Sequence, residues 1–228
     1  MSIADNLREI QSKIEAAARR GDRDPADVKI VAVTKTQPAS YVDEAARWGQ
    51  RLFGENYAQE LVAKAKAVHA EVEWHFIGSL QGNKVRQIAG LVSLIHSVDR
   101  LSLAQEIDRQ WQKLNLCCDL LIEVNIAGEG TKSGARTGEV IDLARRVAAL
   151  PHVRLKGLMT MPPFFDDPEG ARPYFRELRS IAAKIGAEKI PRVEMKVLSM
   201  GMSGDYEVAV EEGATLVRIG TAIFGKRL

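Results

Sequence analysis

The chain has 228 residues, of which 46% are hydrophobic and 27% are charged, as in an ordinary globular domain. Its 32 basic and 30 acidic residues leave a net charge of +2. That balance argues against a nucleic-acid or polyanion surface, which needs clustered excess charge. Two adjacent cysteines, Cys117 and Cys118, predict no disulfide framework and no metal site, and they fit a reducing compartment. Residues 2–20 are charged throughout, so we expect no signal peptide, no membrane span and a cytoplasmic protein.

Apolar periodicity and turn signals predict alternating strands and helices along the first half of the chain. Asp99 stands directly before the last of these helices and is its predicted N-cap. The predicted helices cover residues 3–18, 38–48, 57–68, 83–89 and 101–114. The predicted strands cover residues 29–35, 51–56, 73–79 and 91–98.

The same alternation continues through the second half. Thr137 is the predicted cap of the first helix there, and a glycine-rich loop at residues 128–134 precedes it. The predicted strands cover residues 119–126, 153–161, 193–200 and 215–220. The predicted helices cover residues 140–150, 169–185 and 206–212.

About eight strands that alternate with helices indicate a parallel sheet, and this number at this length predicts a (β/α)8 barrel of the TIM type. We expect residues 1–228 to form this single domain, since no linker, repeat or low-complexity segment interrupts them. The chain stops at Leu228, so no helix is expected after the last strand, and the helix at residues 3–18 would fill that gap. The alternative is an open doubly wound sheet, but no strand leads into G-x-G-x-x-G.

In a barrel, the carboxyl ends of all strands meet at one mouth, so residues at those ends are the candidates for function. Lys35 ends an apolar β-branched strand, where burial would lower its pKa and leave a neutral amine able to attack a carbonyl. A lone lysine there would more often face solvent, so the other residues at the barrel mouth determine whether Lys35 is a functional residue. The strand-end residues are Lys35, Asn56, His75, Asn125, Thr160, Ser199 and Arg218.

Two stretches near the C-terminus predict an anion site opposite Lys35. The run SMGMSGD at residues 199–205 lies between a strand and a helix, where backbone N–H groups and hydroxyls can hold a phosphate, although a plain loop is an equal alternative. The run RIGT at residues 218–221 ends the last strand, and barrels commonly bind phosphate after their last two strands. A Schiff-base lysine facing a phosphate site suits pyridoxal 5′-phosphate or a class I aldolase, and this chemistry leaves both open.

Six motifs decide between these two possibilities. In chain order, they are VAVTKT at 31–36, FGENY at 53–57, WHFIGSLQGNK at 74–84, VN at 124–125 with KSG at 132–134, LSMGMSGD at 198–205 and VRIGTAIFG at 217–225. Their content and order resemble the pyridoxal phosphate homeostasis protein family. The resemblance extends from the first strand to the last, with no departure at the motif positions.

The resemblance implies a single barrel like the N-terminal domain of alanine racemase, with pyridoxal 5′-phosphate bound to Lys35. It implies a non-enzymatic role in intracellular homeostasis of that cofactor, with effects on amino-acid and keto-acid pools. Apo-enzymes that use the cofactor are the expected recipients, and we expect a monomer. Arg218 resembles the racemase arginine that faces the pyridine nitrogen. The predicted cofactor-binding residues are Lys35, Asn56, Ser199, Met200, Ser203, Arg218, Gly220 and Thr221.

The residues also suggest why catalysis should be absent. The permanent charge of Arg218 would keep the pyridine nitrogen unprotonated and weaken the ring as an electron sink. A racemase needs a second acid/base group, which alanine racemases take from another domain of a partner subunit, and we expect His75 to be packed instead. The alternative function is a pyridoxal-phosphate-dependent racemase or lyase. Fast exchange of an amino-acid α-proton in deuterated water would support that alternative.

Overall fold

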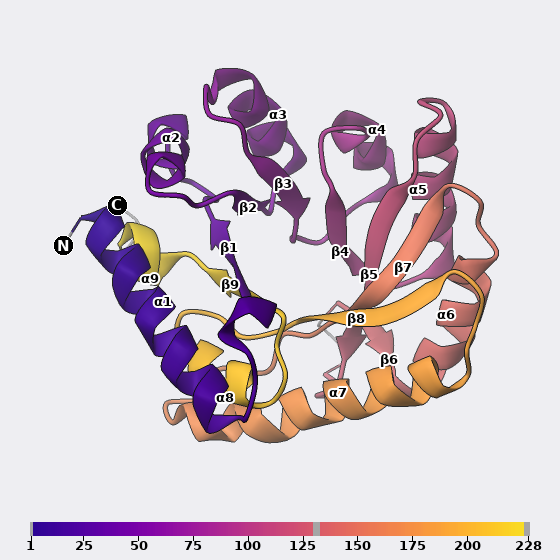
Figure 1. Ribbon diagram of the computed structural model, residues 1–228. Helices are drawn as coiled ribbons and strands as arrows, with labels where there is room; N and C mark the ends of the chain where they lie inside the picture. The colour runs from indigo at the N-terminus through magenta and orange to yellow at the C-terminus, as the bar shows by residue number, and fades with distance from the viewer. Residues whose placement is uncertain (1, 130–132, 226–228) are drawn as a thin grey trace.

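The structure is a computed structural model that describes residues 2–129 and 133–225. Its strands are β1 (Lys29–Val33), β2 (Leu52–Glu55), β3 (Glu73–Phe76), β4 (Leu94–Val98), β5 (Cys118–Asn125), β6 (Ala135–Arg136), β7 (Val153–Met159), β8 (Val193–Ser199) and β9 (Leu216–Ile219). All except β6 lie in one parallel sheet in the order β4-β3-β2-β1-β9-β8-β7-β5, and β4 also pairs with β5 (Figure 1). The pairing of β4 with β5 closes the sheet into the predicted barrel. The two-residue strand β6 pairs in parallel with the carboxyl end of β5.

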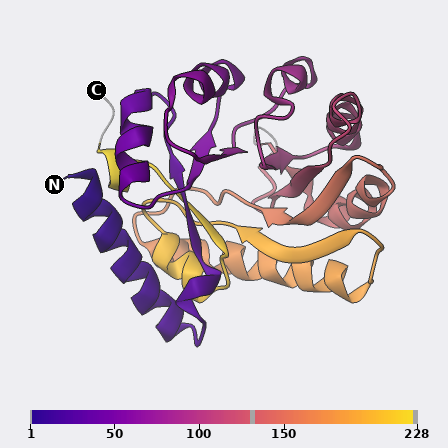
Figure 2. The ribbon, with the colours of Figure 1, turned by 45° about the horizontal axis from the view of Figure 1, so that its top comes forward.

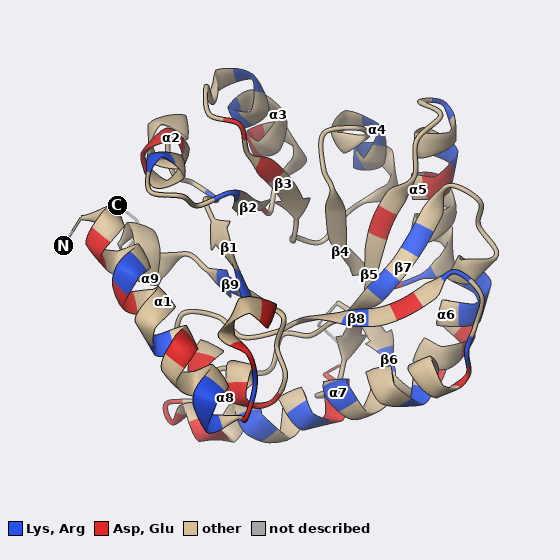
Figure 3. Cartoon of the chain, viewed as in Figure 1, with Lys and Arg blue, Asp and Glu red and all other residues tan. Residues whose placement is uncertain are grey.

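Helices form the outer ring of the barrel, as Figures 1 and 2 show from two directions. They are α1 (Ile3–Arg20), α2 (Ala39–Arg47), α3 (Ala58–Ala67), α4 (Val85–Ile88), α5 (Leu101–Gln112), α6 (Val140–Ala148), α7 (Arg172–Ala187), α8 (Tyr206–Glu211) and α9 (Thr221–Phe224). Within the described ranges, no helix is long and apolar enough to cross a membrane. Basic and acidic residues are interspersed along α1, basic residues predominate on α7, and the charged residues of α8 are acidic (Figure 3).

Helix α1 packs against α8 and α9, so it occupies the predicted gap in the ring. Its N-terminus is a capping box: the Ser2 hydroxyl accepts the Asp5 N–H at 3.2 Å, and the Asp5 carboxylate accepts the Ser2 N–H at 3.3 Å. Ile10, Ile14 and Ala17 are buried at helical spacing, which explains why the apolar period predicted this helix.

Three local predictions were wrong. A short helix, α9, does follow the last strand. Arg100 rather than Asp99 is the N-cap of α5, and no side chain caps this helix; the Asp99 carboxylate pairs with the Arg100 guanidinium at 2.5 Å. Thr137 begins a 3-10 turn at Thr137–Glu139, so it does not cap α6. Part of the predicted glycine-rich loop, residues 130–132 with the lysine of the KSG motif, and the chain end at Leu228 lie outside the described residues.

The barrel interior is layered. Side chains alternate between the two faces of a strand, so residues two apart share a face. One interior layer is apolar and consists of Val31, Leu94, Leu121, Met159 and Leu216. Two residues further along their strands, toward the carboxyl ends, stand His96, Glu123 and Arg218, and Ser199 occupies the matching place on β8. We call these four residues the polar layer; all four are buried, directly below the barrel mouth.

Candidate cofactor site at the barrel mouth

A pocket of about 390 Å³ opens at the carboxyl ends of the strands, and we call it the barrel-mouth pocket. Exposed apolar side chains, Met161, Phe164 and Met202, form part of its rim. It brings together residues from five of the six sequence motifs. The predicted site residues that line it are Lys35, Asn56, Ser203, Arg218, Gly220 and Thr221.

Ser199 and Met200 lie behind this pocket rather than along it. Ser199 is the last residue of β8, and its side chain points into the barrel and is fully buried. Met200, the next residue, packs in the outer apolar core, and its N–H donates to the Leu216 carbonyl at 3.1 Å. Alternation along the strand therefore sends these neighbours to opposite sides. The run 199–205 is not one continuous lining of the pocket.

Lys35 lies two residues beyond the end of β1 and is half-buried. Both of its neighbours are held in place. The Thr34 hydroxyl donates to Glu55 Oε1 at 2.7 Å, and the Thr36 N–H donates to Glu60 Oε2 at 2.8 Å. Thr36 also has a φ of 63°, a left-handed conformation that needs such support. We call residues 34–37 the Lys35 loop.

A buried lysine connects these contacts. Lys64 on α3 donates from Nζ to the Thr34 carbonyl at 2.5 Å, to Glu55 Oε1 at 2.6 Å and to Glu60 Oε2 at 3.1 Å. Burial raises the pKa of Glu55, and the hydrogen bonds from Lys64 and Thr34 oppose that rise. The sequence prediction missed Glu55 and Lys64. A signal was present, since Glu55 stands in an apolar strand and Glu60 and Lys64 are spaced as an i,i+4 pair.

Arg218 lies inside the barrel, not in solvent. Its Nη1 donates to Ser199 Oγ at 2.6 Å and its Nη2 donates to the Thr160 carbonyl at 3.0 Å. Burial lowers its pKa to about 10, with Glu123 and Asp205 opposing that shift, so it keeps its charge at pH 7. A fixed positive charge therefore stands at the floor of the barrel-mouth pocket.

The two C-terminal stretches meet in space, as the sequence analysis expected. The Ser203 hydroxyl accepts the Ala222 N–H at 3.3 Å, and this links residues 201–205, which we call the serine loop, to the turn at Gly220. The backbone N–H groups of Ser203, Gly204 and Thr221 have no hydrogen bond to any other described residue. A Cβ on Gly220 would lie 3.2 Å from the Val33 carbonyl oxygen, so glycine permits the close approach to β1.

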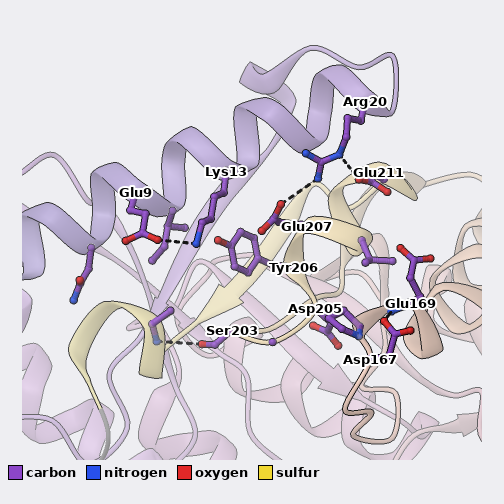
Figure 4. Close-up of a pocket in the computed structure, with 16 residues that line it drawn as sticks. Glu9, Lys13, Arg20, Asp167, Glu169, Ser203, Asp205, Tyr206, Glu207 and Glu211 are labelled. Atoms are coloured by element: carbon purple, nitrogen blue, oxygen red, sulfur yellow. Dashed lines mark hydrogen bonds and ion pairs between the residues drawn. The ribbon is translucent and has the colours of Figure 1, made fainter. Parts of the chain in front are cut away.

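The serine loop has a second face. Figure 4 shows the cleft of about 540 Å³ behind it, between α1 and α8, where Ser203 and Asp205 form part of the wall. Among the described residues, the two cations that line this cleft are already paired: Lys13 with Glu9 at 2.6 Å, and Arg20 with Glu211 at 2.6 Å. The serine loop is therefore a thin partition between this outer cleft and the barrel-mouth pocket.

The remaining strand-end candidates have structural roles. The His75 ring is buried and shares a hydrogen bond with His96, which the sequence analysis did not single out. The Thr160 hydroxyl donates to the Val124 carbonyl at 2.9 Å, and the Asn125 amide donates to the Glu129 carbonyl at 2.8 Å. Asn56 differs, because it lines the pocket and its buried Oδ1 has no partner among the described residues.

Comparison with known proteins places the chain in a family. Residues 3–227 match the family described as alanine racemase, N-terminal domain. The chain is 43% identical over 228 residues to the pyridoxal phosphate homeostasis protein of Aquifex aeolicus, covering 100% of this chain and 99% of the relative. It is 43% identical over 229 residues to the protein of the same name from Escherichia coli, covering 99% and 97%.

Solved structures agree with this placement. PipY of Synechococcus elongatus, solved with PLP bound, superposes with a TM-score of 0.86 at 33% identity, over 98% of this chain and 100% of PipY. Alanine racemase of Clostridium difficile shares the fold, with a TM-score of 0.75 at 16% identity, over 98% of this chain and 57% of the racemase. The barrel, the mouth motifs and full-length identity to curated relatives together show that this chain belongs to the pyridoxal phosphate homeostasis proteins, a family built on the alanine racemase N-terminal domain.

Proposed function

We propose that this protein binds pyridoxal 5′-phosphate in the barrel-mouth pocket and serves in cellular homeostasis of that cofactor rather than in catalysis. The observation that carries the proposal is the meeting of three groups in one pocket: the amine of Lys35, the free N–H groups at Ser203 and Thr221, and the guanidinium of Arg218. A phosphorylated aldehyde with a basic ring nitrogen suits all three. The bound form of PipY and the names of the relatives support the same ligand.

The residues present fit the cofactor. Asn56 offers a buried Oδ1 that lacks a partner among the described residues, which is costly unless a ligand or water satisfies it. Ser203, Gly204, Gly220 and Thr221 can hold the phosphate through backbone N–H groups and hydroxyls. Bound to lysine, the cofactor supplies an electron-withdrawing ring. We place Ser199 and Met200 behind the site as supports.

Two features favour binding over catalysis. The charge of Arg218 disfavours a proton on the ring nitrogen, and an unprotonated ring is a weaker electron sink. His75, the histidine considered as a second acid/base group, lies in the barrel interior against His96 and does not line the pocket. We further propose that the protein acts as a cytoplasmic monomer that supplies apo-enzymes, and light scattering on the purified protein tests the monomer.

We expect Lys35 to carry the cofactor covalently, because among the described residues it is the lysine that lines the barrel-mouth pocket. Loading the protein with pyridoxal 5′-phosphate, reducing it with borohydride and mapping the peptides should place the pyridoxyl group on Lys35. Lys35→Met should lose the label and the visible absorption of the bound cofactor. A label on another lysine in the wild-type protein, at one equivalent of cofactor, would contradict the assignment.

We expect Ser203→Ala to weaken cofactor binding roughly 2- to 10-fold, since a neutral hydrogen bond contributes about 0.5–1.5 kcal/mol. Gly220→Ala should weaken it more, because the added Cβ would press on the Val33 carbonyl, which precedes the Lys35 loop. Ser40→Ala, at an exposed position on α2, is the matched control. Equilibrium titration followed by fluorescence measures the cofactor affinity of all three variants. Wild-type affinity in both site variants would contradict the proposed position of the phosphate.

A further inference from the structure

We infer that Ser199, His96 and His75 form a hydrogen-bond chain of one fixed direction, which holds Arg218 in its place at the floor of the barrel-mouth pocket. The chain itself stands on geometry alone. Its consequence for the bound ring rests on the proposed function. These three residues are positioning residues, since only Arg218 reaches the pocket.

The chain runs through the barrel interior across three strands. Arg218 Nη1 lies 2.6 Å from Ser199 Oγ, Ser199 Oγ lies 2.9 Å from His96 Nδ1, and His96 Nε2 lies 3.0 Å from His75 Nδ1. Ser199 and His96 are fully buried, and His75 is 5% exposed. Each link is within ordinary hydrogen-bond distance, and water has little access to any of them.

The chemistry of the groups determines the direction. Arginine can only donate, so Ser199 Oγ accepts from Arg218. The Ser199 hydroxyl must then donate its own proton, and among the described residues His96 Nδ1 is the other group bonded to it. His96 Nδ1 is therefore the acceptor, so the proton of a neutral His96 ring lies on Nε2 and is donated to His75 Nδ1. The reverse direction would leave a fully buried hydroxyl proton without an acceptor, which costs free energy.

Electrostatics favour the same arrangement. A neutral ring that turns its unprotonated nitrogen toward a cation is stabilised, whereas an imidazolium there would be repelled. Burial lowers the pKa of His75 to about 4, and burial together with the charge of Arg218 lowers that of His96. Both rings are therefore neutral at pH 7, as a chain of single donors requires.

The result for Arg218 is a fixed side chain. Thr160, directly after β7, holds Nη2 through its carbonyl and Ser199 on β8 holds Nη1, so two acceptors from separate segments define the guanidinium plane. Without the Ser199 acceptor, the guanidinium would keep only the Thr160 contact and could rotate about it. A ring nitrogen that faces Arg218 would then experience a different field and a different hydrogen-bond partner.

The first experiment uses the cofactor-free protein and needs no variant. Long-range ¹H–¹⁵N correlation spectra distinguish the two nitrogens of each histidine ring. We expect His75 and His96 to be neutral at pH 7, each with its proton on Nε2. A proton on Nδ1 of His96, or an equal mixture of the two forms, would overturn the fixed direction.

The second experiment tests the effect on the ring, with pyridoxal 5′-phosphate labelled with ¹⁵N at the ring nitrogen. Ser199→Ala should shift the ring-nitrogen resonance and weaken binding roughly 10-fold, because the Arg218 guanidinium loses the acceptor that holds it in place toward the pocket. Ser97→Ala is the matched control: Ser97 is 2% exposed on β4, and its Oγ has no partner among the described residues. It should leave the resonance and the affinity unchanged.

The outcomes separate the two proposals. An unchanged ring-nitrogen resonance in Ser199→Ala, with the cofactor bound, would overturn the positioning role. Equal shifts in Ser199→Ala and Ser97→Ala would also overturn it, since they would report general loosening of the barrel. A wild-type protein that binds no cofactor would overturn the proposed function, while the histidine spectra would still test the chain. If Ser199→Ala does not fold, His96→Leu should shift the resonance and His96→Gln, which retains an acceptor, should not.

Discussion

Lys64→Met should lower the free energy of unfolding by about 3–5 kcal/mol, since removing one partner leaves the other partner's buried charge uncompensated. Lys64 is 7% exposed and its partner Glu55 is 0% exposed. The same substitution removes the donor to the Thr34 carbonyl, so the Lys35 loop should loosen and cofactor binding should weaken. Urea unfolding of the cofactor-free protein measures the stability change, and cofactor titration measures the second effect.

Lys13→Met is the matched control. Lys13 pairs with Glu9 at 2.6 Å, the same distance as in the Lys64–Glu55 pair, but their side chains are 48% and 47% exposed. An exposed pair contributes about 0–1 kcal/mol, so this variant should be nearly as stable as the wild type. Adding Glu55→Gln to Lys64→Met should recover part of the loss by removing the orphaned charge. Equal destabilisation by Lys64→Met and Lys13→Met would show that burial does not determine how much these ion pairs contribute to stability.

Between pH 5 and 8, the free energy of unfolding of the wild type should fall by about 2–3 kcal/mol relative to that of Glu123→Gln. Glu123 is 4% exposed in the polar layer. Burial raises its pKa from 4.5 to about 7, with Asp99 adding to the rise and Arg218 opposing it. A raised carboxyl pKa stabilises the fold fully below the unfolded pKa of 4.5, and that stabilisation is lost as the pH rises through about 7. Glutamine does not titrate, so the variant lacks this loss.

The buried histidines act in the opposite sense over part of this range. Burial lowers the pKa of His75 to about 4 and that of His96 well below 6.5, so both rings gain protons on unfolding in acid. Their stabilisation is therefore lost as the pH falls below about 6.5. Because wild type and variant share this effect, the difference between their urea unfolding curves isolates Glu123. If the free energy of unfolding depends on pH in the same way in both proteins, the pKa of Glu123 is not raised by burial in the barrel, and this prediction is wrong.

Much of the site could be predicted because strand ends in a parallel barrel converge. Lys35, Asn56 and Arg218 follow from that rule, and the structure brings all three to one pocket. The residues that hold them could not be predicted the same way. From sequence alone, Lys64 is one of two lysines on an amphipathic helix, and His96 is an ordinary residue of a strand. Their partners come from other elements, so their roles depend on contacts that local sequence does not encode.

The sequence by itself determined the fold and the family, because strand and helix periods are local and the mouth motifs occur in a specific order. The tertiary structure decided which face of each strand points inward. It sends Ser199 into the barrel, where its hydroxyl bonds Arg218, and Met200 into the outer core. It also decided the place of Lys35, beyond the end of β1, through the buried Glu55 and Lys64. The physical reason is that burial and charge pairing are properties of surfaces brought together from distant segments, and closure of the barrel is what brings them together.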